Sequence, residues 1–247
     1  AISLHVIVWV LLFLAIFAGF QGGRYYLANR LQELGIASAL VVYALGAWRS
    51  LFHLPRREWL AWAVAPVLLI GGIMGVSSLV FVLNYSGNPL YSFFSAREFL
   101  LAFIGPGIYL LCRTGLPVDG VRRVFLFALF ALMVNYLFFY FTMDLRAAFF
   151  SSDHTVSNLV TYDEWRGFRL KPPLFAVMVA LLAALMLLGQ SRRAGMVLVA
   201  LVLLGLGAYI WSIVMFRSTL ASMLLAMLLY PLLFAGRQRI MLLVVMA

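Results

Sequence analysis

The chain has 247 residues, of which 66% are hydrophobic and only 11% are charged. Soluble domains carry roughly a quarter charged residues, whereas a bilayer can cover a largely apolar exterior directly. The composition therefore predicts an all-α, polytopic membrane protein. The net charge of +10 then reflects membrane topology and contact with membrane lipids, and nucleic acid is not expected as a partner.

Apolar runs of about 20 residues, the length needed to cross a bilayer, recur along the chain. We expect transmembrane helices near 2–20, 36–52, 59–83, 94–112, 123–142, 173–189, 195–216 and 218–235. A ninth begins at about 240. Together they predict one transmembrane domain over 1–247 with eight or nine helices, truncated at its C-terminus.

Two of these helices contain notable glycines. Gly71 and Gly75 form a GxxxG pattern in the third helix, which favours close helix packing. Gly105-Pro106-Gly107 lies in the fourth helix and is expected to kink or break it. In a membrane, such a break requires protein or water to satisfy the backbone groups that it frees.

The loops between the helices alternate between a strongly and a weakly basic side. Ten basic residues lie on one side, in the loops 49–58, 113–123, 190–194 and 236–239. Eight lie on the other side, in the longer loops 21–35, 84–97 and 143–172 and at the turn near Arg217. The positive-inside rule places the first side in the cytoplasm. We therefore expect a cytoplasmic N-terminus and an outward-facing loop at 143–172.

The outer loop at 143–172 holds half of the acidic residues of the chain and a basic cluster, Arg166, Arg169 and Lys171. This cluster precedes a helix that begins at two prolines, and helix N-termini attract anions. Arginine can grip phosphate through two parallel hydrogen bonds, so the cluster could bind a diphosphate. Alternatively, these side chains reach toward lipid headgroups, with Asp163 and Glu164 as local partners.

Arg217 is the only charged residue between Gly195 and Ala235. That stretch is long enough for two spans, so Arg217 marks the outer turn between them. An arginine at the centre of a bilayer costs at least about 2.5–3.5 kcal/mol. Its side chain therefore either reaches the interface as an anchor or faces a wet cavity as part of a site.

Two further residues of the outer loop are candidates. Trp165 could stack on a sugar ring, although tryptophan also anchors proteins at the membrane interface. His154 is the histidine that is placed to act as an outer-surface base, although a lone loop histidine is usually only solvated. The sequence contains no HExxH, CxxC, Walker lysine loop or GxSxG motif, so we expect neither a metal nor a cofactor.

Three short segments of the sequence form a further pattern. They are Ser95-Ala96-Arg97-Glu98-Phe99-Leu100, Trp165-Arg166-Gly167-Phe168-Arg169-Leu170-Lys171-Pro172-Pro173 and Phe216-Arg217-Ser218-Thr219-Leu220. The pattern resembles the O-antigen ligase and O-antigen polymerase superfamily over about residues 95–235. Its members tend to have an Arg/Gly/Pro-containing segment that enters one helix, and an Arg-Ser element that opens a helix two spans later.

The resemblance implies a metal-independent glycosyltransferase of cell-surface polysaccharide, such as lipopolysaccharide, at the outer face of the bacterial inner membrane. Its donor would be an undecaprenyl-diphosphate-linked glycan, and its acceptor another glycan, a lipid or a protein. Arg217 matches the Arg-Ser element, and Arg166 or Arg169 matches the earlier arginine. The superfamily's large outer loop, with the histidine thought to be the base, comes later than this sequence extends, so the general base is expected outside it.

The charge chemistry agrees with this implication, because arginines can stabilise a diphosphate leaving group in place of a metal. Two intervening spans would bring Arg217 and the 166–169 cluster to the same membrane face. Two rivals stay open: a transporter or flippase for an anionic or lipid-linked substrate, and a non-catalytic membrane subunit. Transport predicts arginines along a path that is reachable from both sides, whereas the enzyme predicts them on the outer side only.

Overall fold

The computed structural model describes residues 4–20, 28–85, 88, 97–152, 157, 160–164, 167–171, 174–190 and 194–214. Over these residues the protein is mostly helical. The chain separates into two compact units, which we call unit 1 (Ala1–Ala128) and unit 2 (Leu129–Ala247). The boundary falls inside helix α7 (Val118–Thr142).

Four helices in the described ranges are long and apolar enough to cross a membrane: Leu31–Leu51, Arg56–Asn84, Val118–Thr142 and Ala194–Ile213. Three more are apolar but shorter: Leu4–Gly19, Phe99–Arg113 and Val177–Leu188. These seven helices coincide with the first seven predicted spans. The predicted spans at 218–235 and from 240 onward lie outside the described residues, so the count of eight or nine stays a prediction.

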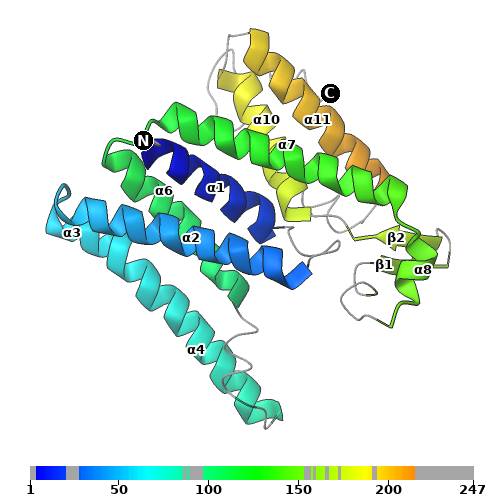
Figure 1. Cartoon of the computed structure of the whole chain (residues 1–247), viewed down its shortest axis with the longest axis horizontal. Helices are drawn as coiled ribbons and strands as arrows, with labels where there is room; N and C mark the ends of the chain where they lie inside the picture. Colours follow the sequence, from blue (N-terminus) through cyan, green and yellow to red (C-terminus); the bar gives the residue numbers. More distant parts are fainter. Residues whose placement is uncertain are drawn as a thin grey trace. The chain divides into compact units, whose positions relative to one another are not determined.

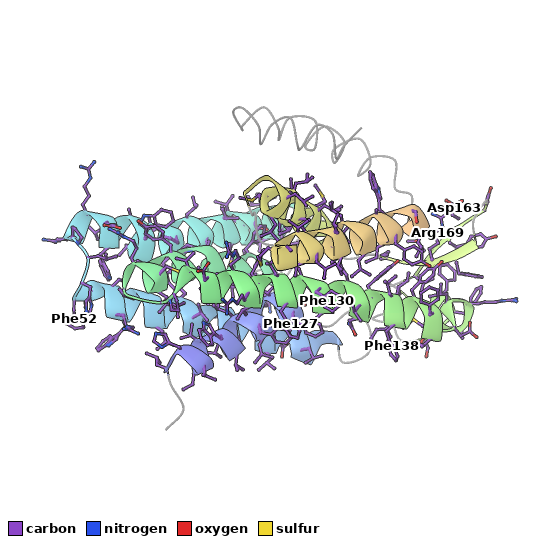
Figure 2. The ribbon with its side chains drawn as sticks, turned by 90° about the horizontal axis from the view of Figure 1, so that it is seen from above. Phe52, Phe127, Phe130, Phe138, Asp163 and Arg169 are labelled. Carbon is purple, nitrogen blue, oxygen red and sulfur yellow. The ribbon has the colours of Figure 1, made fainter. Side chains whose placement is uncertain are left out.

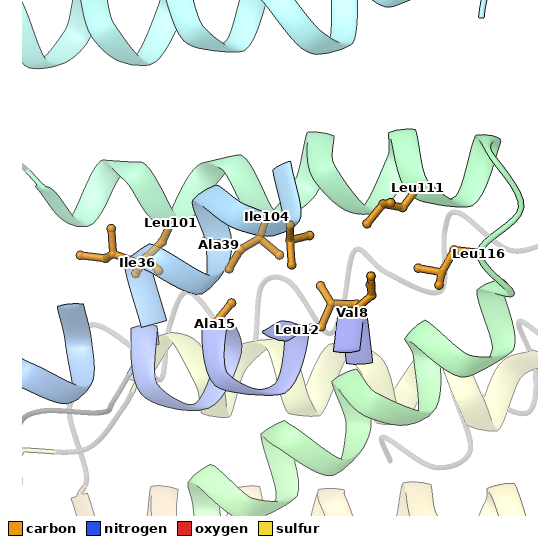
Figure 3. Packing of buried hydrophobic residues seen from close by; sticks show 10 residues of the cluster. Val8, Leu12, Ala15, Ile36, Ala39, Leu101, Ile104, Leu111 and Leu116 are labelled. Atoms are coloured by element: carbon orange, nitrogen blue, oxygen red, sulfur yellow. The ribbon is translucent and has the colours of Figure 1, made fainter. Parts of the chain in front are cut away.

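Unit 1 is built around α1 (Leu4–Phe20), α2 (Ala28–Leu51) and α6 (Ile104–Arg113), which lie side by side (Figure 1). Val8, Leu12 and Ala15 recur every three or four residues and form one buried stripe of α1. Figure 3 shows this stripe facing buried apolar residues of α2, of α6 and of the segments that flank α6: Ile36, Ala39, Leu101, Ile104, Leu111 and Leu116.

Glycines let α2 approach both of its neighbours closely. A Cβ atom added at Gly35 of α2 would lie 2.3 Å from the backbone nitrogen of Gly19 in α1. A Cβ atom added at Gly107 of α6 would lie 2.9 Å from the Cα atom of Tyr43 in α2. Real Cβ atoms essentially never come so close to backbone, so a larger residue at either position would push the helices apart.

The GxxxG pair in the third predicted span behaves differently. An added Cβ atom at Gly71 or Gly75 would meet no atom within 4 Å among the described residues. The predicted close packing at this pair is therefore wrong for the described structure, because the pair lies on an outward face of α4 (Ala65–Tyr85).

The third and fourth predicted spans both depart from regular α-helix. The third begins as α3 (Arg56–Trp59), continues through the π-helical segment η1 (Leu60–Val64) and becomes α4. The fourth begins as the 3₁₀ helix η2 (Arg97–Phe103) and becomes α6 at Ile104. The break expected at Gly105-Pro106-Gly107 thus takes the form of a change of helix type. Pro106 falls in the first turn of α6, where its missing N–H costs little.

Unit 2 contains the rest of α7, then α8 (Leu145–Phe149), β1 (Val160–Asp163), β2 (Gly167–Leu170), α10 (Leu174–Gln190) and α11 (Ala194–Val214). Gly207 of α11 allows close contact with α10, since an added Cβ atom would lie 2.9 Å from Leu181. The predicted loop at 143–172 matches the interval between α7 and α10. The strand pair inside it is a feature that the all-α prediction did not include.

Candidate functional site

The described residues include two of the six predicted site residues, Arg169 and Lys171. The other four, His154, Trp165, Arg166 and Arg217, lie outside the described residues. Arg169 is part of β2, and Lys171 follows that strand directly as a half-buried side chain. The described part of the candidate site is therefore the β1–β2 hairpin, together with the helices α7 and α8 that contact it.

The hairpin has two chemically different faces. β1 and β2 pair antiparallel, with Val160 opposite Leu170 and Thr161 opposite Arg169. Because successive side chains of a strand point to opposite faces, Arg169 shares its face with Thr161 and Asp163. Gly167 opens β2 at a φ of 72°, a left-handed conformation that glycine adopts without steric cost.

The other face of the hairpin is apolar and packs on α8. Val160 and Leu170 are buried. The rings of Tyr162 and Phe168 lie 5.0 Å apart, and Phe149 of α8 lies 5.3 Å from Phe168. These contacts attach the hairpin to α8 by aromatic packing, as Figure 1 shows for the three elements.

α8 begins where the sequence supplies a cap. The Asp144 carboxylate accepts hydrogen bonds from the backbone N–H groups of Arg146 and Ala147, both at 3.0 Å. A side-chain oxygen at this position satisfies N–H groups that the first turn leaves unpaired. One of the loop's four acids therefore has a local structural role.

A buried tyrosine ties the end of the hairpin to α7. The hydroxyl of Tyr136, which is fully buried, donates a hydrogen bond to the carbonyl oxygen of Leu170 at 3.2 Å. Leu170 directly precedes Lys171. This bond therefore holds the end of β2 against α7, just before Lys171 and the start of α10.

The polar face of the hairpin carries an ion pair between Arg169 and Asp163. Nη2 of Arg169 lies 3.8 Å from Oδ2 of Asp163, and Figure 2 labels both residues on the strand pair. The Arg169 side chain is only 15% exposed, while that of Asp163 is 45% exposed. Desolvating a guanidinium is costly unless a carboxylate accompanies it, so Asp163 supports the cation in this position.

This geometry bears on both interpretations of the basic cluster. The local acidic partner expected for lipid-facing arginines is present as Asp163. A low-exposure arginine on a folded hairpin is also better oriented for a bidentate contact than a mobile side chain. Among the described residues, no group of three or more His, Cys, Asp or Glu side chains could hold a metal ion.

The hairpin was not predicted, although the sequence carries a weak but readable signal for it. Val160-Thr161-Tyr162-Asp163 and Gly167-Phe168-Arg169-Leu170 each alternate apolar with polar or small residues. That period of two is typical of half-buried strands. It was overlooked because each run is only four residues long inside a very apolar chain.

A second unpredicted feature is the contact of Glu58 with Tyr109 and Arg113 in unit 1, which we call the Glu58 clasp. Glu58 of α3 accepts hydrogen bonds from the hydroxyl of Tyr109 at 2.8 Å and from Nε of Arg113 at 2.9 Å, both on α6. Residues more than fifty positions apart meet here, and no local pattern connects them.

Comparison of the chain with protein-family models, with curated proteins and with solved structures finds no match.

Proposed function

We propose that this protein transfers or polymerises a glycan from a polyprenyl-diphosphate-linked donor at the outer face of a bacterial inner membrane. The observation that carries the proposal is Arg169, a cation of low exposure that Asp163 supports on a folded hairpin between two apolar helices. In the proposed topology the hairpin lies at the outer membrane surface, where this arginine would meet the headgroup of a lipid-linked donor.

The proposed reaction breaks the bond between the sugar's anomeric carbon and the diphosphate oxygen. A new bond forms between that carbon and an acceptor hydroxyl oxygen, whose proton passes to a general base. The polyprenyl diphosphate leaves with an added negative charge. Arg169, with Lys171 nearby in the chain, would stabilise that charge, and donors fixed before the reaction do so most effectively.

Asp163 would act as a positioning residue in this scheme. Its carboxylate limits the orientations that the Arg169 guanidinium can take, so fewer conformations are lost when a diphosphate binds. Arg166 and Arg217 are proposed to contribute further positive charge, on the basis of the resemblance alone. Trp165 is proposed to stack on the sugar, and His154 is a candidate base. Both roles rest on the sequence alone.

The experiment uses a strain that depends on this protein for its surface glycan. Arg169→Ala, Arg169→Lys and Asp163→Asn are each expressed in the full-length protein, and glycan length and membrane abundance are measured on gels and blots. Arg146→Ala is the matched control, because Arg146 is an exposed arginine on α8 in the same extramembrane segment. We expect normal abundance throughout, with glycan assembly lost for Arg169→Ala and reduced for Arg169→Lys.

The proposal is wrong if Arg169→Ala leaves glycan length unchanged at normal abundance. It is also wrong if Arg146→Ala impairs assembly as much as Arg169→Ala, because the effect would then reflect loss of any positive charge.

A transporter or flippase is the second candidate, and one observation favours it. The two irregular segments of unit 1, η1 and η2, both contact Tyr43 of α2: its hydroxyl donates to the carbonyl of Ala63, and its ring lies 4.5 Å from that of Phe103. Interrupted helices at a common point are typical of transporter binding sites. If the protein is a transporter, Tyr43→Phe should lower the rate of substrate transport. If it is the proposed enzyme, Tyr43→Phe should leave glycan assembly unchanged.

A further inference from the structure

One end of unit 1, which we call the basic end, gathers arginines from the helix ends beside two loops that are far apart in the sequence. The loop between α2 and α3 and the loop between α6 and α7 meet there, since Arg49 donates to the carbonyl oxygen of Thr114 at 3.4 Å. The arginines of the basic end are Arg49, Arg56, Arg57, Arg113, Arg122 and Arg123. Its two carboxylates are Glu58 and Asp119.

Both carboxylates of the basic end are already engaged. Glu58 accepts from Nε of Arg113 at 2.9 Å, from its Nη2 at 3.3 Å and from the hydroxyl of Tyr109. Asp119 lies 2.8 Å from Nη2 of Arg122. The acids of this end therefore neutralise Arg113 and Arg122 and leave the charge of the other arginines uncompensated.

Three of the remaining arginines are exposed, whereas Arg49 is half-buried. Arg56, Arg57 and Arg123 are exposed, and none of them pairs with a carboxylate among the described residues. The short helix α3 that carries Arg56 and Arg57 is held firmly. Its Trp59 donates from Nε1 to the carbonyl oxygen of Ala47 at 3.0 Å, and the Glu58 clasp attaches it to α6. These arginines are thus presented from a fixed backbone.

Exposed aromatic residues lie within a few positions of these arginines in the sequence. Trp48, in the last turn of α2, and Phe52, in the turn that follows it, are 67% and 70% exposed, with ring centroids 5.9 Å apart. Trp62 stacks on Tyr109 at 4.2 Å and is also exposed. Figure 2 labels Phe52 at the turn that ends α2. Aromatic rings beside arginines at the end of an apolar helix are typical of the membrane–water interface.

We propose that the basic end of unit 1 is a binding surface for the phosphate groups of anionic phospholipids. Guanidinium groups bind phosphate through paired hydrogen bonds, and the neighbouring aromatic rings insert at the level of the headgroups. The surface lies at the ends of helices that are apolar enough to span a bilayer, so lipid is the anion source closest to it. This inference does not depend on glycan transfer by the hairpin.

The test measures which lipids the purified full-length chain retains. The protein is reconstituted in phosphatidylcholine containing phosphatidylglycerol and extracted, and the retained lipids are quantified by mass spectrometry. We expect the wild type to be enriched in phosphatidylglycerol. Each arginine removed from an anionic surface weakens attraction by about fivefold, so Arg56→Gln/Arg57→Gln should abolish most of that enrichment.

The matched control removes the same charge elsewhere. Arg97→Gln/Arg146→Gln lowers the net charge equally, but Arg97 already pairs with Glu33 at 3.4 Å and Arg146 lies on α8. This control should retain the wild-type enrichment. Arg123→Gln, on α7, is a second test variant should the double variant fail to fold, and it should lose enrichment partially.

Three results would overturn the proposal. The first is a wild type that shows no preference for phosphatidylglycerol. The second is an equal loss of enrichment in the control and in Arg56→Gln/Arg57→Gln. The third is displacement of the bound lipid by inorganic phosphate, because the surface would then recognise a free anion rather than a lipid headgroup.

Discussion

Arg113 in unit 1 and Arg169 in unit 2 each pair with a carboxylate, but in opposite ways. Arg113 is 53% exposed, and its partner Glu58 is 22% exposed and also bonded to Tyr109. Arg169 is 15% exposed, and its partner Asp163 is 45% exposed and lies 3.8 Å away. In the first pair the protein encloses the anion, and in the second it encloses the cation.

The difference separates a structural contact from a candidate site. A carboxylate that three hydrogen bonds hold between two helices fastens α3 to α6, and its geometry would be lost if a ligand competed for Arg113. A guanidinium that is oriented beside a more exposed carboxylate can exchange that partner for a diphosphate with less disruption. The comparison predicts that substitutions at the two arginines fail in different ways.

The largest expected effect is a difference in labelling from outside the cell between the two regions, because we expect them to lie on opposite sides of the membrane. Phe52 and Phe150 are both 70% exposed, and Cys112 is the only cysteine of the chain. In a Cys112→Ser background, we expect an impermeant maleimide added to intact spheroplasts to label Phe150→Cys and not Phe52→Cys. Labelling of both cysteines after the membrane is permeabilised is the control. Labelling of Phe52→Cys in intact spheroplasts would reverse the proposed orientation.

The second effect is catalytic and distinguishes the two arginines. Removing one preorganised donor from a developing negative charge costs about a hundredfold or more in rate. We expect that loss for Arg169→Ala in glycan assembly per molecule of membrane-inserted protein. Arg113→Ala should instead lower the amount of folded protein while each remaining molecule works normally. If the two variants fail in the same way, the distinction drawn here is wrong.

The third effect concerns the close helix contacts of unit 1. Gly107→Leu would force a side chain against the backbone of Tyr43, and overpacking of this kind costs about 1–3 kcal/mol or more. We expect a clearly lower midpoint of thermal unfolding in detergent. Gly75→Leu is the matched control, because an added Cβ atom there meets no atom of the described residues within 4 Å. An equal fall in both variants would mean that the substitution itself, and not the contact, is responsible.

The smallest effect concerns the anchor of the hairpin. Tyr136→Phe removes the hydroxyl that donates to the carbonyl of Leu170 and should cost about 1 kcal/mol of stability. Tyr140→Phe, one turn further along α7, is the control and should be neutral. Hydrogen exchange at Arg169 and Leu170 should increase only in Tyr136→Phe. Unchanged protection would show that the hairpin is held by its aromatic face alone.

The positions of the helices were the part of the fold that the sequence could predict, because each depends on a local run of apolar residues. The predicted ends at 142 and 173 agree closely with the last residue of α7, Thr142, and the first of α10, Leu174. The packing was harder to predict. The GxxxG pair at Gly71 and Gly75 matches a packing motif but makes no close contact among the described residues, whereas Gly35 and Gly107, which belong to no GxxxG pair, form the close crossings.

The sequence could indicate which residue types belong to the candidate site, but not how the strands arrange them in space. Arg169 was singled out because it belongs to a basic cluster just before a helix N-terminus, and Asp163 was one of the two acids expected as local partners in the lipid-headgroup alternative. The antiparallel pairing that places both on one face depends on two short strands, which composition conceals. The Glu58 clasp could not be predicted, since it joins residues that only the packing of α3 on α6 brings together.

The most direct test of the central claim is the affinity of the purified full-length protein for a polyprenyl diphosphate, in nanodiscs of phosphatidylcholine. Displacement of a fluorescent short-chain analogue would compare wild type with Arg169→Lys and with the control Arg146→Lys. We predict that Arg169→Lys binds about tenfold more weakly or worse, since lysine cannot make the paired hydrogen bonds, and that Arg146→Lys binds as the wild type does. Equal affinity in all three proteins would contradict the claim that Arg169 recognises the diphosphate.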